Sequence, residues 1–167
     1  DMHEPSGDLE RLAQALRDQW QIARIQAGPA ILRKLQPALR KGKWAVTVAV
    51  YADHRDEAAR IVDIWPGFHE GPLLGLAIDL GSTTIAAHLT DLSTGAVVAS
   101  GGMMNPQIRF GEDLMSRVSY AMMNPGGDTE MTAAVRLAIN ALAQSVAAEA
   151  GADPAAIIEV VVVCNPV

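Results

Sequence analysis

The feature that most constrains the fold of this chain is the segment from Asp79 to Thr84, which stands between two apolar runs. The first run covers residues 73–78 and the second covers residues 85–89. An apolar run that ends in an acidic residue, turns through glycine and hydroxyl residues and returns as a second apolar run is typical of a β-hairpin. The sequence therefore predicts two antiparallel strands that are joined by a tight turn.

The residues of this turn suit the binding of a phosphate group and Mg²⁺. Gly81 lets the backbone come close to a ligand because it has no side chain. The amides of Gly81, Ser82 and Thr83 can point at phosphate oxygens, and the hydroxyl groups of the turn, including that of Thr84, can add donors. Asp79 can hold hydrated Mg²⁺, since this ion binds few carboxylates and keeps its waters. The alternative is an ordinary β-turn after a strand that ends in aspartate.

A second motif, at residues 104–120, follows the hairpin and reads MNPQIRFGEDLMSRVSY. The hairpin resembles the first phosphate motif of the acetate kinase, sugar kinase, chaperone and actin superfamily. The second motif resembles the N-P-Q-x-x-x-G-x-D-[VL]-x-[ST]-R-[IV] segment of the reductive activators of corrinoid proteins, which are ferredoxin-like ATPases. The resemblance runs from about Asp8 to the last residue, and both specific motifs lie after residue 72.

This resemblance implies a function for the parent protein. Such activators return an inactive Co(II) corrinoid protein to Co(I) in methyl transfer, and ATP hydrolysis drives the step. The resemblance implies that Asp79 is catalytic and holds Mg²⁺ through water, and that Gly81 to Thr84 bind the phosphates of ATP. It implies a [2Fe–2S] domain before this chain and further ATPase sequence after it. The chain is thus expected to be a fragment that is not a competent ATPase by itself.

The second motif contributes three further candidate cofactor-binding residues, namely Asn105, Gln107 and Asp113. Asp113 also stands where a helix N-cap is expected, and that role alone would explain it. Arg109 and Arg117 can reach phosphates or can pair with the neighbouring acidic residues. The sequence leaves these alternatives open.

The composition limits the partners and the location of the protein. The net charge of −6 gives no basic stripe for nucleic acid. No long apolar run lacks charges and turn signals, so no membrane contact is expected, and the protein is expected to be cytoplasmic. The single cysteine, Cys164, excludes a disulfide framework and an iron–sulfur cluster within this chain. The corrinoid protein is the expected partner, and a homodimer is expected through the tryptophan-containing region before Leu73.

The overall expectation is an α/β chain of two domains. Residues 1–72 are expected to form a small α+β linker and middle domain, with helices at 8–20 and 29–42 and a hairpin of strands 44–51 and 60–65. Pro37 is expected to kink or split the second helix, and residues 53–56 form the turn of this hairpin.

Residues 73–167 are expected to form the opening half of an actin-like, ribonuclease H-like ATPase subdomain. The predicted order is three antiparallel strands, a short helix, a long helix and a final strand, at residues 73–80, 84–92, 96–100, 113–122, 129–150 and 157–164. The final strand is apolar on both faces, so it is expected inside a helix-covered sheet with Cys164 in the core. Asn165, which ends it, is a further candidate for facing a nucleotide.

Two other classes of function fit the same fold. One is a small-molecule kinase that acts on a sugar or a carboxylate, which a four-cysteine ferredoxin pattern upstream would exclude. The other is a non-enzymatic actin-like module, which failure of the full-length protein to turn over ATP, together with filament formation, would favour.

Overall fold

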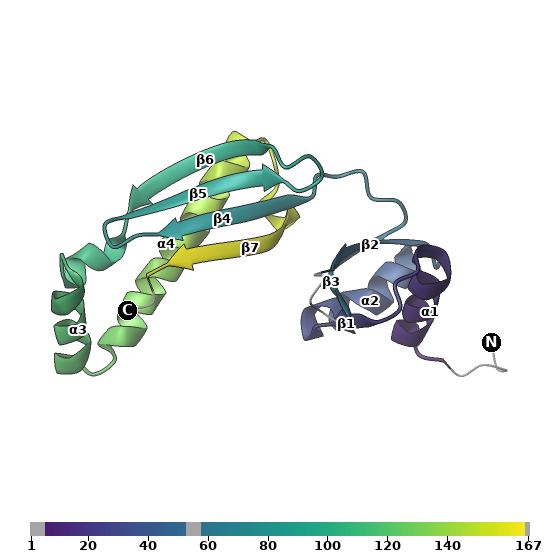
Figure 1. Cartoon of the computed structure of the whole chain (residues 1–167), viewed down its shortest axis with the longest axis horizontal. Helices are drawn as coiled ribbons and strands as arrows, with labels where there is room; N and C mark the ends of the chain where they lie inside the picture. Colours follow the sequence, from purple (N-terminus) through teal and green to yellow (C-terminus); the bar gives the residue numbers. More distant parts are fainter. Residues whose placement is uncertain (1–5, 53–57, 166–167) are drawn as a thin grey trace. The chain divides into compact units, whose positions relative to one another are not determined.

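The computed structural model describes residues 6–52 and 58–165 and divides the chain into two compact units, Asp1–Glu70 and Gly71–Val167 (Figure 1). Each unit has its own sheet and its own apolar core. The turn that was expected at residues 53–56 lies outside the described residues. The mixed α/β fold class predicted from the sequence is confirmed.

The first unit is a three-stranded sheet with two helices. Its elements are α1 (Asp8–Trp20), β1 (Ile25–Ala27), α2 (Pro29–Lys41), β2 (Val46–Tyr51) and β3 (Ala59–Pro66). The strand order is β1-β3-β2, with β1 parallel and β2 antiparallel to β3. The helices bury Leu16 and Leu35 against Ile61 and Ile64 of β3. The three-residue strand β1 was not predicted, because it is too short to show an apolar period.

Helix α2 continues across Pro37 as one helix, so the predicted split does not occur. It begins after Gly28 with Pro29 in its first turn, a position where proline has no hydrogen bond to lose. The residues Leu35 and Leu39 on either side of Pro37 are buried. Their packing on the sheet offsets the hydrogen bond that Pro37 cannot make.

The second unit is a four-stranded sheet that carries the predicted hairpin. Its elements are β4 (Leu74–Leu80), β5 (Thr84–Asp91), β6 (Val97–Met104), the 3₁₀-helix η1 (Pro106–Phe110), α3 (Leu114–Met123), α4 (Gly127–Glu149), the 3₁₀-helix η2 (Pro154–Ala156) and β7 (Ile157–Cys164). The order is β6-β5-β4-β7, in which β4 is antiparallel to β5 and parallel to β7. This is the strand and helix order that was expected for the opening half of an actin-like subdomain.

Helix α4 covers one face of this sheet (Figure 1). Its buried residues Leu142 and Val146 pack with Leu76, Ile78 and Ile85 of the strands. By length and composition, α4 is the one helix of the described residues that could cross a membrane. This is weak evidence for a membrane span, because its packing on the sheet also accounts for its apolar composition.

Strand β7 departs from the expectation of an inner strand. It lies at the edge of the described sheet, and Val160, Val161, Val162 and Val163 are between 45% and 64% exposed. Cys164 is also exposed rather than in the core. The reason is that α4 packs on β5 and β6, which leaves β7 uncovered by the residues that the structure describes.

Candidate functional site

The turn between β4 and β5, called here the β4–β5 turn (residues 81–84), is closed by one backbone hydrogen bond. The amide of Gly81 donates to the carbonyl oxygen of Thr84 at 3.0 Å. A Cβ atom at Gly81 would lie 2.8 Å from that same oxygen, so only glycine permits this closure. The amide of Gly81 is therefore hydrogen-bonded within the hairpin, and the cofactor-binding role expected for Gly81 remains a prediction.

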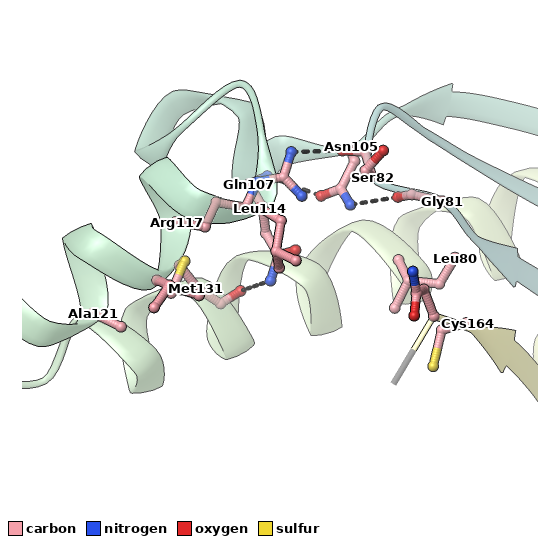
Figure 2. Close-up of a pocket in the computed structure, with 12 residues that line it drawn as sticks. Leu80, Gly81, Ser82, Asn105, Gln107, Leu114, Arg117, Ala121, Met131 and Cys164 are labelled. Carbon is pink, nitrogen blue, oxygen red and sulfur yellow. Dashed lines mark hydrogen bonds between the residues drawn. The ribbon is translucent and has the colours of Figure 1, made fainter. Parts of the chain in front are cut away.

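The carbonyl groups of the turn are bound by the second motif. The Asn105 side-chain Nδ2 donates to Gly81 O at 2.8 Å, and the Asn105 backbone amide donates to Thr83 O at 2.8 Å. The Arg117 Nη2 donates to Ser82 O at 2.6 Å. Figure 2 shows Asn105 and Arg117 directed at Gly81 and Ser82. Two residues that follow the turn by 24 and 35 positions thus bind three consecutive carbonyls, two through their side chains and one through the Asn105 backbone amide.

Arg117 as a whole is 9% exposed, and its guanidinium also joins the turn to the loop before α3. Its Nε donates to Gly111 O at 2.8 Å. A Cβ atom at Gly111 would lie 2.7 Å from the Arg117 amide nitrogen, so glycine lets this loop approach α3. Within residues 6–52 and 58–165, no carboxylate lies within ion-pairing distance of Arg117. Of the two roles expected for Arg117, pairing with its acidic neighbours is thus not observed.

Asn105 is almost fully buried, with 2% of its surface exposed, and uses both ends of its amide. Its Oδ1 accepts from the amide of Gln107 at 2.9 Å and so caps η1, while its Nδ2 holds Gly81. The Gln107 side chain donates in turn to the carbonyl of Met131 in α4, at a long 3.5 Å. These two residues therefore link the turn to the helices.

Asp113 caps the N-terminus of α3, as the sequence predicted. Its carboxylate accepts from the amide of Ser116 at 2.7 Å. Hydrogen bonds from the Ser116 side chain and, to a smaller degree, its backbone hold the pKa of Asp113 below the usual value. Arg109 lies over the Phe110 ring at 4.5 Å and makes none of the turn contacts. The cofactor role that was expected for Asp113 remains a prediction.

A cavity of about 330 Å³ lies beside the turn. Its wall is mostly apolar, with polar groups from the turn and from the second motif, as Figure 2 shows. The residues that line it are Leu80, Gly81, Ser82, Asn105, Gln107, Leu114, Arg117, Val118, Ala121, Met131, Cys164 and Asn165. An apolar cavity with a few convergent polar groups is a common form of small-molecule site.

Asp79 lies on the other side of the sheet from this cavity. Leu76 and Ile78 point into the core beneath α4, so the alternation of a strand directs Ala77 and Asp79 to the exposed face. Neither Asp79 nor Thr83 and Thr84 line the cavity. The structure thus places the candidate residues around one turn but divides them between the two faces of the sheet.

No cluster of three or more histidine, cysteine, aspartate or glutamate side chains occurs among the described residues. Asp79, at the end of β4, is the carboxylate that the hairpin itself offers to an ion. One carboxylate, phosphate oxygens and water form a ligand set that suits Mg²⁺. The residues present fit Mg²⁺ bound together with a phosphate ligand rather than a permanently held metal.

The strand order β6-β5-β4-β7, with β7 parallel to β4, agrees with the actin-like subdomain that was expected. The sequence comparisons are more specific, because residues 1–71 match the RACo linker region and residues 74–167 match the RACo middle region. The chain belongs to the RACo family. The RACo middle region is therefore the second unit, and not part of residues 1–72, where a middle domain was expected.

Two similar proteins extend this result. The corrinoid activation enzyme RamQ of Eubacterium limosum is 39% identical over 67 residues, which are 40% of this chain and 11% of that protein. The solved structure of a reductive activator for corrinoid, iron–sulfur protein matches 99% of this chain with 32% identity and a TM-score of 0.80. The chain spans about a quarter of the length of that structure, since the match covers 26% of it.

Proposed function

We propose that this chain provides the linker and middle regions of an ATP-dependent activator that returns Co(II) corrinoid proteins to Co(I). The family and the two similar proteins support corrinoid activation as the general role. The role of ATP in this proposal rests on the hydrogen bonding of the β4–β5 turn, in which all four backbone carbonyls accept hydrogen bonds from within the protein. Within the described parts of the chain, the amides of Ser82 and Thr83 meet no hydrogen-bond acceptor.

The chemistry of these residues follows from their positions. Unpaired backbone amides in a tight turn form a site for phosphate oxygens. Ser82 and Thr83 would therefore hold a phosphate of ATP by their amides, with the exposed hydroxyls of Thr83 and Thr84 as further donors. Asp79 would orient hydrated Mg²⁺, which neutralises charge on the transferring phosphate.

Electron transfer needs a redox group that the described residues do not form. We propose that a [2Fe–2S] centre elsewhere in the longer protein donates the electron, because Cys164 alone cannot hold a cluster. The proposed partner is a corrinoid protein. ATP can drive its reduction only if the ATP and ADP states of the activator differ in their affinity for the Co(II) and Co(I) forms.

We also propose that the protein is a cytoplasmic homodimer that associates through the first unit. Trp20, which is 71% exposed, supports an interface there. The other two tryptophans are engaged within the unit, since Trp44 lies under Arg40 and Trp65 stacks on His69. Sedimentation of the 167-residue chain as a strict monomer at high concentration would contradict this part of the proposal.

The test of the ATP role is Asp79→Ala in the longer protein, with Asp128→Ala as the control. Asp128 lies in the first turn of α4 and makes none of the turn contacts. We expect Asp79→Ala to lower Mg²⁺-dependent ATP hydrolysis by about 100-fold or more, because a group that organises charge at the reacting phosphate is lost. We expect near-normal hydrolysis from Asp128→Ala. Equal turnover in both variants would remove Asp79 from the mechanism.

A further inference from the structure

The β4–β5 turn has a backbone that a hairpin does not favour by itself. Two-residue hairpin loops normally use turns with a positive φ at one or both central residues, which match the twist of the strands. Among the described non-glycine residues, only Gln21, Lys43 and Trp44 have a positive φ. Ser82 and Thr83, the central residues here, therefore form a different turn that needs support from outside the hairpin.

The support comes from Asn105 and Arg117, and it fixes the direction of the amides. In a trans peptide the N–H points opposite to the C=O of the same unit. Because Gly81 O and Ser82 O are bound on the side of the second motif, the amides of Ser82 and Thr83 point away from that side. The two side chains thus turn the phosphate-binding groups outward.

Arg117 also places a positive charge on the side of the turn where the carbonyls lie. No carboxylate lies within 4.0 Å of it among the described residues, so its close contacts on this side of the molecule are with backbone carbonyls. Its guanidinium fork reaches Ser82 O and Gly111 O together, which a lysine ammonium on a flexible stem cannot reproduce with the same geometry.

We infer that Asn105 and Arg117 are positioning residues that hold the Ser82 and Thr83 amides in place for the phosphates of ATP. The inference rests on the proposed function, since it takes ATP as the ligand. Neither side chain needs to touch the nucleotide, because both act through the carbonyls of the turn. In this interpretation the motif at residues 104–120 serves to fix the backbone of the hairpin turn.

The experiment compares Arg117→Lys and Asn105→Ser with Arg109→Lys in the longer protein. Arg109 belongs to the same motif and lies over the Phe110 ring, but among the described residues it makes none of the hydrogen bonds to the β4–β5 turn. Calorimetry measures the affinity of each protein for ATP with Mg²⁺ and for adenosine, which lacks phosphates. Loss of overall folding would lower both affinities, whereas loss of the amide geometry would lower only that for ATP.

We expect Arg117→Lys and Asn105→Ser to weaken ATP binding by about tenfold or more, the loss that follows from one or two misplaced hydrogen bonds to a charged group. Adenosine binding should stay within twofold, and Arg109→Lys should match the unchanged protein. Unaltered ATP affinity in both turn variants, or an equal loss of ATP and adenosine binding, would overturn the inference. Failure of the unchanged protein to bind ATP would instead reject the proposed function and, with it, ATP as the ligand of this turn.

Discussion

The two hairpin turns of the second unit differ in what holds them. The turn between β5 and β6, called here the β5–β6 turn (residues 92–96), is held mostly by its own neighbours, with one further bond from the Leu92 amide to the carbonyl of Leu73 at 2.8 Å. The Asp91 carboxylate accepts from the Ser93 amide at 2.8 Å, and Gly95 takes φ +77° and donates to the carbonyl of Asp91 at 2.7 Å. The β4–β5 turn instead depends on Asn105 and Arg117, which belong to other elements.

This difference separates a structural turn from a turn available for function. A local turn satisfies its own polar groups and leaves little for a ligand to bind. A turn whose carbonyls accept hydrogen bonds from other elements on one side can present unpaired amides on its opposite side. The comparison predicts that substitutions at the β4–β5 turn lower the stability of the protein more than equivalent substitutions at the β5–β6 turn. It also predicts that only the β4–β5 turn responds to substitutions in the second motif.

The largest effect on stability is expected for Gly81→Ala. The added Cβ would meet the backbone oxygen of Thr84 at 2.8 Å, and this oxygen cannot move without opening the hairpin. We expect a loss of about 2–3 kcal/mol in the free energy of unfolding. For Gly95→Ala we expect about 1 kcal/mol, because nothing lies near the added atom and only the positive φ is unfavourable. Urea unfolding of the 167-residue chain measures both, and equal losses would break the comparison.

A smaller loss is expected for Asn105→Ala. The substitution leaves Gly81 O and the Gln107 amide without their partner in a buried place, at a cost of about 1–3 kcal/mol. The control is Asn124→Ala, whose side chain donates to Tyr120 O at an exposed helix end and should cost less than about 1 kcal/mol. A loss from Asn105→Ala no greater than that from Asn124→Ala would show that the β4–β5 turn does not depend on the second motif.

The smallest effect is the acid response of the β5–β6 turn. The hydrogen bond from the Ser93 amide lowers the pKa of Asp91 below its ordinary value of 3.8. A carboxyl with a lowered folded-state pKa stabilises the folded protein above the unfolded value, and this contribution is lost as the pH falls through the folded-state value. The NMR signal of the Ser93 amide should thus titrate with a midpoint below pH 3.8, and Asp91→Asn should abolish this titration. A midpoint at or above 3.8 would contradict this assignment.

The sequence predicted those features that depend on neighbouring residues. The two apolar runs on either side of Asp79 to Thr84 predicted the hairpin, and the position of Asp113 at the start of the expected helix predicted it as the cap of α3. Apolar residues at helical spacing between positions 131 and 146 predicted α4, although the helix begins at Gly127, two residues earlier than the expected start at 129. These outcomes follow from local periods and capping chemistry, which a single sequence contains.

Features that depend on distant residues were not predictable. The contacts of Arg117 to Ser82 O and Gly111 O require that α3 folds back on the hairpin, and no period in the sequence encodes this. The edge position of β7 was also missed, since an apolar strand predicts burial but not which element covers it. The best signal for the role of Arg117 was its place in the same motif as Asn105 and Gly111. Nothing in that motif connects an arginine to the backbone carbonyls of a turn 35 residues earlier.

The most direct test of the account is the backbone order parameter of Ser82 and Thr83 in the 167-residue chain, measured by NMR relaxation with Ser93 and Thr94 as the internal reference. A rigid backbone gives values of about 0.85 and a flexible one gives values below about 0.6. The account predicts rigid values at both turns in the unchanged chain. In Arg117→Lys, values should fall clearly at Ser82 and Thr83 and remain unchanged at Ser93 and Thr94. Unchanged values at all four residues in that variant would contradict the claim that the second motif holds the β4–β5 turn.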